Sequence, residues 1–442
     1  MLNCAAVRQN LKPYDQSITM TSKTKIIVIG AGPAGMMAAG QAAQRGAEVT
    51  LIERMERPGR KLRITGKGRC NITNDCPRDE FLHHFESGGR FLKPSFYEFF
   101  APDLITFLAS LGVETVTERG NRVFPAGNQA KEVVDALADW VKKMGVRTRT
   151  RTRAEKLLLS ERAIRGISAR SSNSGAAEDL HADAVIIATG GMSYPLTGST
   201  GDGYRMAHDA GHSMVPTRPA LVPLETAEDW AQRLQGLSLK NVKASLWMDR
   251  EKGSHEFGEM LFTHFGVSGP IILTLSLQAV DALHAGKQVS LSIDLKPALD
   301  DKILDARLLR DFENHRNMQI QNLLRGLLPP TLIPVCLDMT AIPADRMGNQ
   351  ISAKERRRLR LWLKDFQLAV TGHRPIDEAI ITAGGVNLKE VNAKTMESRL
   401  VKGLFFAGEV LDIDADTGGY NLQAAFSTGY LAGISAAGMR ED

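Results

Sequence analysis

The chain has 442 residues, of which 43% are hydrophobic and 24% are charged, with 40 glycines and a net charge of +5. This is the profile of a globular protein of two or three domains, and it excludes disordered and fibrous chains. No run of 18 apolar residues occurs, so no membrane span is predicted. Residues 1–22 lack the apolar core of a signal peptide, so we expect a disordered extension and a cytoplasmic location.

A buried strand followed by a glycine-rich turn opens the folded part. Residues 25–29 (KIIVI) form an apolar run that predicts a parallel strand buried on both faces. The turn Gly30-Ala-Gly-Pro-Ala-Gly35 follows, then a helix of small residues, and then a second strand that ends in Glu53. In this pattern the glycines allow a tight turn, close approach of main-chain N–H groups to a pyrophosphate, and close helix packing. We therefore predict a dinucleotide-binding βαβ unit in which Glu53 accepts hydrogen bonds from ribose hydroxyls.

The last forty residues predict a second wall of the same site. Residues 403–408 (GLFFAG) read as a buried strand, and residues 417–421 (TGGYN) precede a second helix of small residues. The N-terminus of such a helix stabilises the negative charge of a reduced flavin, and an NAD dehydrogenase needs no such return. A strand at 183–191 ends in an ATGG turn, and no second G-x-G-x-x-G follows a strand. The pattern predicts non-covalent FAD and no dedicated NAD(P)H domain.

Longer motifs resemble those of the HI0933-like (BaiN-like) family of FAD-dependent oxidoreductases. They are GRKLRITGKGRCNITN (59–74), RVFPAG (122–127), ATGGMSYPLTGSTGDGY (188–204), EMLFTHFGVSGP (259–270) and AGEVLDIDADTGGYNLQAAFSTG (407–429). The resemblance implies an α/β fold: a Rossmann-like FAD-binding domain of the two-dinucleotide-binding-domain flavoprotein type, with an inserted antiparallel β-barrel-like domain and a small helical subdomain. We expect the FAD domain at 23–200 plus 380–442, the β-rich insert at 201–300 plus 364–379, and the helical subdomain at 301–363.

The fingerprint and the resemblance together give the expected cofactor residues. They are Gly30, Gly32, Pro33, Ala34, Gly35, Glu53, Arg54, Lys61, Thr65, Gly66, Gly68, Arg69, Cys70, Asn71, Asn74, Ala188, Thr189, Gly190, Gly191, Gly408, Glu409, Asp412, Gly418, Gly419, Tyr420 and Asn421.

Catalytic candidates are fewer, because the flavin carries the redox chemistry. Cys70 is a candidate proton donor, with a structural thiol as the alternative. His264, in the 259–270 motif, is the histidine best suited to acid–base work, with a structural histidine as the alternative. Tyr194 and Tyr420 flank glycine-rich turns and are candidates for positioning substrate. The four cysteines form no Cys-x-x-Cys pair, and no metal site is predicted.

Two basic runs bear on the partner. In residues 147–153 four arginines alternate with threonines, which predicts one charged face of a single strand, either a solvated edge or an RNA or phosphate contact. Residues 354–360 (KERRRLR) form a basic helical run with the same two interpretations.

The resemblance implies reduction of a C=C or C=O bond through bound FAD, and uridine in ribosomal RNA, reduced to dihydrouridine, is the predicted substrate. The alternatives are a small-molecule flavin reductase or oxidase acting on an enone, a steroid or an amine, and an FAD-containing nucleic-acid-binding protein with a structural flavin. NAD(P)H is the expected transient electron donor. The substrate identity, the physiological electron donor, the catalytic acid or base and the oligomeric state stay open.

Overall fold

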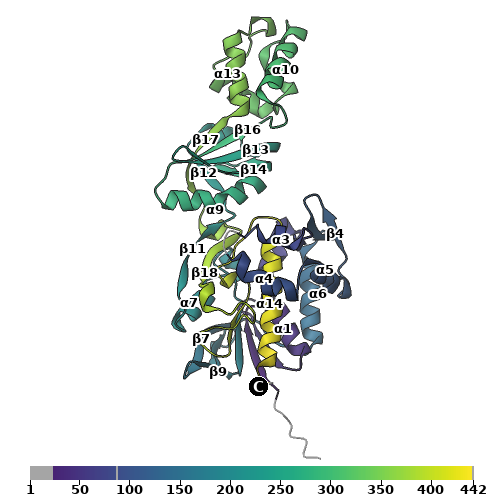
Figure 1. Cartoon of the computed structure of the whole chain (residues 1–442), viewed down its shortest axis with the longest axis vertical. Coiled ribbons are helices and arrows are strands. Elements are labelled where there is room, and N and C mark those ends of the chain that lie inside the picture. The colour runs from purple at the N-terminus through teal and green to yellow at the C-terminus, as the bar shows by residue number, and fades with distance from the viewer. Residues whose placement is uncertain (1–22, 86–87, 441–442) are drawn as a thin grey trace, which may run out of the picture.

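The computed structural model describes residues 23–85 and 88–440 and shows three parts stacked along one axis (Figure 1). An α/β domain forms one end, a β-barrel lies in the middle, and a helical subdomain forms the other end. The expected disordered extension at residues 1–22 lies outside the described residues. No helix in the described ranges combines the length and the hydropathy that crossing a bilayer requires.

A five-stranded parallel sheet organises the α/β domain, in the order β19-β10-β1-β2-β6. Its strands are β1 (Lys25–Ile29), β2 (Glu48–Ile52), β6 (Arg147–Arg149), β10 (Ala184–Ile187) and β19 (Leu404–Phe406). In the central register Ile27 pairs with Val185 on one side and with Thr50 on the other. Nearly every residue of β1 and β10 is buried, as the continuous apolar runs predicted. The predicted Rossmann-like fold is confirmed.

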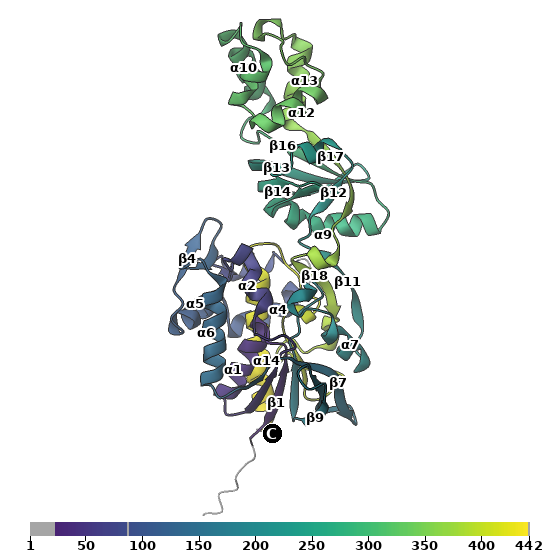
Figure 2. The same cartoon turned by 180° about the vertical axis from the view of Figure 1, so that it is seen from behind.

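Helices from opposite ends of the chain cover the sheet. Helix α1 (Pro33–Gln44) packs directly on α14 (Tyr420–Ala437), and α6 (Ala130–Lys143) packs on α1 (Figure 2). The antiparallel sheet of β7 (Thr152–Ser160), β8 (Ala163–Ser171) and β9 (Ala177–His181) contacts β2 and β10. The C-terminal helix α14 therefore completes the α/β domain that β1 and α1 begin.

Smaller elements complete the α/β domain. They are α2 (Arg60–Ile64), β3 (Thr73–Asn74), α3 (Arg78–Leu82), α4 (Gly89–Glu98), α5 (Ala101–Ser110), β4 (Thr115–Glu118), β5 (Arg122–Pro125), α7 (Asp202–Asp209), β11 (Met214–Ala220) and β18 (Ile381–Val386).

The insert is a closed six-stranded antiparallel barrel in the order β12-β15-β14-β13-β16-β17. Its strands are β12 (Leu224–Thr226), β13 (Ser238–Met248), β14 (Glu251–Phe262), β15 (Gly266–Ser268), β16 (Val289–Asp294) and β17 (Phe366–His373). Helix α9 (Pro270–His284), which the sequence analysis did not anticipate, packs on β14 and also contacts β11 of the α/β domain. It therefore lies between the barrel and the domain below (Figure 1).

The helical subdomain consists of α10 (Asp301–Asn314), α11 (Ile320–Leu323), α12 (Ile333–Thr340) and α13 (Ala353–Lys364). Asp300 caps α10 by accepting from the Ile303 N–H at 2.8 Å, and Ser352 with Glu355 forms a capping box at the start of α13. Leu308 and Phe312 belong to the same hydrophobic core as Phe366 of the barrel. The subdomain is thus anchored on the barrel and projects away from the α/β domain.

Two details differ from the sequence-based expectations. The insert was expected to begin at residue 201. However, α7 contacts β7 and β11 pairs with β18, so both belong to the α/β domain and the barrel itself begins at β12.

The prediction of one arginine strand over 147–153 is wrong. Strand β6 ends at Arg149, Arg151 turns with a φ of 53°, and β7 belongs to another sheet. The four arginines therefore do not share one strand face.

Candidate flavin and substrate site

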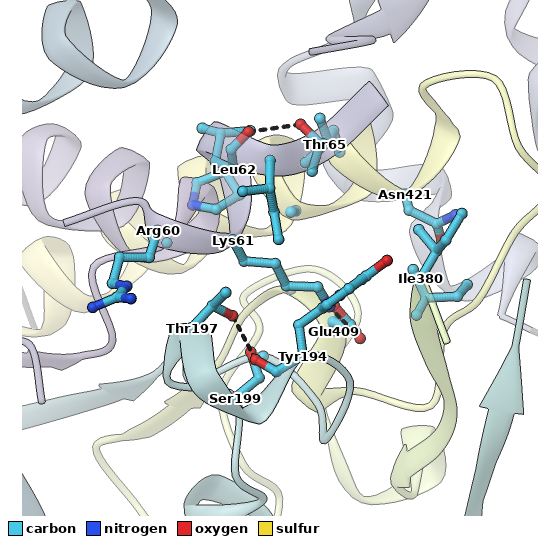
Figure 3. A pocket seen from close by; sticks show the side chains of 18 of the residues that line it. Arg60, Lys61, Leu62, Thr65, Tyr194, Thr197, Ser199, Ile380, Glu409 and Asn421 are labelled. Carbon is cyan, nitrogen blue, oxygen red and sulfur yellow. Dashed lines mark hydrogen bonds and ion pairs between the residues drawn. The ribbon is translucent and has the colours of Figure 1, made fainter. Parts of the chain in front are cut away.

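A cavity of about 760 Å³ runs from the dinucleotide turn to the lower edge of the barrel. One wall carries Gly30 and Gly32, a second carries Gly418 and Gly419 before α14, and a third is formed by barrel residues such as Leu261. Figure 3 shows side chains from α2, from the turn after β10, from the residue before β18 and from the start of α14 around the same space. The cavity is large enough for a dinucleotide end and an adjoining small molecule or base.

Glu53 holds the dinucleotide turn in shape. Its Oε2 accepts from the Ala31 N–H at 2.9 Å, and its Oε1 accepts from the Met55 N–H at 2.8 Å. Burial raises the pKa of this carboxyl, and the two main-chain N–H donors oppose the rise. Because Glu53 also lines the cavity, its remaining lone pairs are available to ribose hydroxyls.

Two observations show that these residues suit FAD. A Cβ built on Gly32 meets no atom within 4 Å, so open space lies in front of the N-terminus of α1, which has no side-chain cap. The buried Oδ1 of Asn71, a cavity residue, has no hydrogen-bond partner in the described part of the chain. The first feature suits a pyrophosphate and the second suits an N–H donor such as a flavin ring offers.

A charged network forms part of the cavity wall (Figure 3). Lys61 Nζ donates to Glu409 Oε2 at 2.8 Å and to Ser193 Oγ at 2.7 Å. Glu409 Oε1 also accepts from the Thr382 N–H at 2.9 Å. The network joins α2, the turn after β10, β18 and the segment after β19, so it fixes four chain segments around one space.

The turn before α14 is held by side chains behind it. Asn74 Nδ2 donates to the Gly418 carbonyl at 3.3 Å, and Asn421 Nδ2 donates to the Ala415 carbonyl at 2.8 Å. Tyr420 is buried and stacks on His84, with ring centroids 3.9 Å apart. These contacts present Gly418 and Gly419 to the cavity at the N-terminus of an 18-residue helix, where anionic groups are stabilised.

Most of the expected cofactor residues line the cavity. These are Gly30, Gly32, Pro33, Ala34, Glu53, Arg54, Lys61, Thr65, Gly66, Asn71, Ala188, Thr189, Gly190, Gly408, Glu409, Gly418, Gly419 and Asn421. Others lie behind it or beside it: Gly35, Gly68, Arg69, Cys70, Asn74, Gly191, Asp412 and Tyr420.

Several residues of this second group have roles of their own. The guanidinium of Arg69 pairs with Glu118 and lies 4.2 Å from the centroid of the Phe124 ring. Asp412 is half-buried, and burial raises its pKa. Gly35 lies against the Gly30 carbonyl, where its lack of a side chain allows α1 to approach the turn.

Neither of the two catalytic candidates from the sequence lines the cavity. Cys70 is fully buried, and burial raises the pKa of its thiol to about 12. His264 is exposed in the turn between β14 and β15. In the described residues no group of three or more His, Cys, Asp or Glu side chains is placed to hold a metal ion.

The barrel and helix α9 contribute cavity residues that sequence reasoning did not find. They are Ser238, Glu259, Met260, Leu261, Ser268, Gly269, Pro270 and Leu273. Several lie within the 259–270 motif, so the resemblance marked the segment, although His264 was the residue chosen from it. Tyr194, Thr197 and Ser199 line the cavity from the turn after β10.

A comparison with protein-family models identifies the family to which this chain belongs. The model described as the HI0933-like protein Rossmann domain matches residues 24–435. The chain belongs to the HI0933-like family. Its members are FAD-dependent oxidoreductases, and this chain is therefore an FAD-dependent oxidoreductase.

Curated relatives cover nearly the whole chain. The 3-dehydro-bile acid delta(4,6)-reductase of Clostridium scindens is 32% identical over 93% of this chain and 99% of its own length. The ribosomal RNA dihydrouridine synthase of Escherichia coli is 32% identical over 91% of this chain and 96% of its own length. Among solved structures, 3-ketosteroid delta1-dehydrogenase from Sterolibacterium denitrificans has a TM-score of 0.53 at 13% identity, over 95% of this chain and 100% of that one. That likeness concerns the fold alone.

Proposed function

We propose that this flavoprotein reduces a carbon–carbon double bond conjugated to a carbonyl group. The observation that carries the proposal is the continuity of the cavity from the dinucleotide turn to the barrel. FAD bound at the turn would supply hydride transfer. The space beyond it, toward the barrel, would hold the acceptor.

The cavity has the properties that such an acceptor requires. Its apolar lining residues include Leu221, Leu261, Leu273, Ile380 and Ile381. Apolar walls exclude water from the reacting carbon and hold the flat conjugated system, while a few polar groups orient the carbonyl. The Lys61–Glu409 network supplies polar groups in fixed positions on the cofactor side of the cavity.

The two curated relatives support the proposal through a shared chemistry. A 4,6-diene beside a 3-ketone and the C5=C6 bond beside the C4 carbonyl of uracil are both conjugated to a carbonyl. A double bond next to a carbonyl can be reduced by hydride addition to the β carbon and protonation of the α carbon. One site geometry therefore serves both, and the acceptor depends on what the barrel side admits.

We infer that the acceptor is a uridine in RNA. The support is the charge of the projecting helical subdomain: residues 301–363 hold eleven Lys and Arg against seven Asp and Glu, a net +4 of the chain's +5. Lys354 and Arg357 on α13 are exposed and make no ion pair within the described ranges. Basic side chains on a projecting arm suit the phosphates of a folded RNA.

A small enone is the second candidate. The apolar wall near Leu261 and Leu273 favours it, because a uracil ring leaves much of that surface without contact.

For either acceptor we propose that NAD(P)H reduces the flavin in a transient encounter. A dedicated NAD(P)H domain would need a second parallel sheet, and only one sheet of the described residues is parallel. Saturable reduction by NADPH with micromolar affinity would contradict that route.

The reaction class is tested with chemically reduced holoenzyme under anaerobic conditions. We expect flavin reoxidation by at least one of three acceptors: 2-cyclohexen-1-one, androst-4-ene-3,17-dione, or a single-stranded oligonucleotide that contains uridine. The product should lack the double bond. Reduced flavin that reacts with oxygen but with none of the three would overturn the proposed reaction and favour a structural or oxidase flavin.

The RNA assignment is tested by charge reversal on α13. The double variant Lys354→Glu and Arg357→Glu should weaken binding of the uridine oligonucleotide. The log–log salt slope should fall by about 1.4, since each phosphate contact contributes about 0.7 on a single strand. Because both side chains are exposed, FAD content and thermal stability should stay unchanged.

The matched control reverses two exposed lysines on a helix of the α/β domain, Lys142→Glu and Lys143→Glu in α6. Equal losses in the two double variants would indicate a general charge effect. Binding that does not respond to salt or to the α13 variant would leave the small enone as the acceptor.

A further inference from the structure

Tyr194 brings a phenol into the cavity beside the cofactor region. The residue follows the glycine turn after β10, and it lines the cavity together with Lys61 and Ile380. Figure 3 shows its ring extending from the turn between these two side chains, with the hydroxyl pointing into the open space. No hydrogen bond of this hydroxyl occurs within the described part of the chain, so the group is free to contact a bound molecule.

The backbone at Tyr194 is held in a conformation that side chains rarely adopt. Its φ is 51° and its ψ is 59°, in the left-handed region where a bulky residue costs conformational energy. Three hydrogen bonds hold it there. The Tyr194 N–H donates to the Asp377 carbonyl at 3.3 Å, and the Tyr194 carbonyl accepts from Thr197 N–H at 2.8 Å and Thr197 Oγ1 at 2.7 Å. Asp377 lies in the segment that returns from the barrel, so the phenol is positioned relative to both domains.

The phenol keeps its proton at neutral pH. Partial burial raises the pKa of Tyr194, and the negative charge of Glu378 raises it further. A general acid has to be protonated when the acceptor arrives and has to reach the reacting carbon. Tyr194 meets the first condition by its surroundings, and its hydroxyl lies in the cavity that would hold the acceptor.

Four other candidate acids near the cavity lack one of these properties. Cys70 is buried away from the cavity. Lys61 is engaged by Glu409 and Ser193, and the hydroxyl of Tyr204 donates to the Glu409 carbonyl at 3.2 Å. His264 is exposed and does not line the cavity.

We propose that Tyr194 is the proton donor of the reduction, an inference that rests on the proposed function. Reduced FAD held at the dinucleotide turn would supply a hydride, that is one proton with two electrons, to the carbon β to the carbonyl. The Tyr194 O–H bond breaks as a C–H bond forms at the α carbon, and the phenolate regains its proton from water. The sum is addition of two hydrogens across the double bond and oxidation of the flavin.

The test compares Tyr194→Phe with wild-type holoenzyme and with the matched control Tyr97→Phe, which removes the hydroxyl of an exposed tyrosine on α4. With 2-cyclohexen-1-one as the probe, Tyr194→Phe should slow reoxidation of reduced flavin by about 10²- to 10⁴-fold. Its FAD content and its affinity for the probe, measured by perturbation of the oxidised flavin spectrum, should match wild type. In deuterated water, wild type should label one face of the α carbon, and the residual product of the variant should be labelled on both faces.

A readout without turnover is alkaline titration of tyrosinate absorbance in the oxidised holoenzyme. The wild-type minus Tyr194→Phe difference should appear above the ordinary tyrosine pKa of 10.0. A difference that appears below that value, or an unchanged reoxidation rate in the variant, would overturn the assignment of Tyr194 alone. A wild-type enzyme that reduces none of the three acceptors would instead overturn the proposed function and this inference with it.

Discussion

Replacing Gly32 by valine is expected to give a folded protein that does not retain FAD. Gly32 has a φ of −80° and a ψ of −174°, which a β-branched residue adopts readily, and a Cβ there meets no atom within 4 Å. The side chain would therefore occupy only the space that the pyrophosphate needs. Overpacking costs about 1–3 kcal/mol, or about 5- to 150-fold in affinity, and the rigid turn places Gly32→Val near the upper end.

The measurement is the flavin-to-protein absorbance ratio after gel filtration, together with the melting temperature of the apoprotein. Gly35→Ala provides the contrast, because its Cβ would lie 1.8 Å from the Gly30 carbonyl oxygen and would disturb the turn itself. That variant should lose both FAD and apoprotein stability. Gly326→Val, in open space at the helical subdomain, should change neither. Stoichiometric FAD in Gly32→Val would show that the cofactor phosphates do not contact this turn.

The sequence predicted the cofactor half of the site because its signals are local. An apolar strand, a glycine turn and a terminal acid lie within 30 residues, and each constrains backbone geometry directly. The resemblance then placed Lys61 and Glu409 in the same site, although 348 residues separate them. Their ion pair is consistent with that expectation.

Prediction from local sequence patterns failed where the conformation of a turn or the position of a side chain depends on tertiary packing. Alternating arginines have the period of a strand, and nothing in residues 147–153 marks Arg151 for the left-handed conformation that divides two strands. Helix α9 was missed because most of its residues are buried, among them Ile271, Ile272 and Leu275, so it lacks the polar face that marks an amphipathic helix.

The substrate half of the site was the least predictable part. Leu261 and Leu273 reach the cavity only because the barrel stands over the α/β domain, and no local signal encodes that placement. Neighbours in a motif also diverge in space: Asn71 lines the cavity, while Arg69 turns to Glu118 and Cys70 is buried. A motif therefore identifies a segment near a site more reliably than it identifies the residue that reacts.

The contact between α1 and α14 closes a domain whose two halves lie at opposite ends of the chain. A Cβ on Gly429 would lie 2.3 Å from the Ala34 carbonyl oxygen, and one on Gly433 would lie 2.4 Å from that of Ala38. These glycines are four residues apart, so they share one face of α14. The two helices therefore meet backbone against backbone, with no flexible side chain between them that could yield.

Gly429→Val is accordingly expected to separate the two helices and to destabilise the α/β domain by about 3 kcal/mol, the upper end for overpacking. FAD should be lost as well, because Ala34 and Ala425 of these helices line the cavity. Thermal unfolding and flavin content measure the two effects, and Gly429→Ala should lie between wild type and Gly429→Val. Gly438→Val, at the residue that follows α14 and where a Cβ meets nothing within 4 Å, controls for the replacement of a glycine by valine near this helix. If Gly429→Val melts at the wild-type temperature and retains its flavin, α14 does not close the domain through this contact, and the C-terminal wall of the FAD site must be held by the Asn74 and Asn421 hydrogen bonds instead.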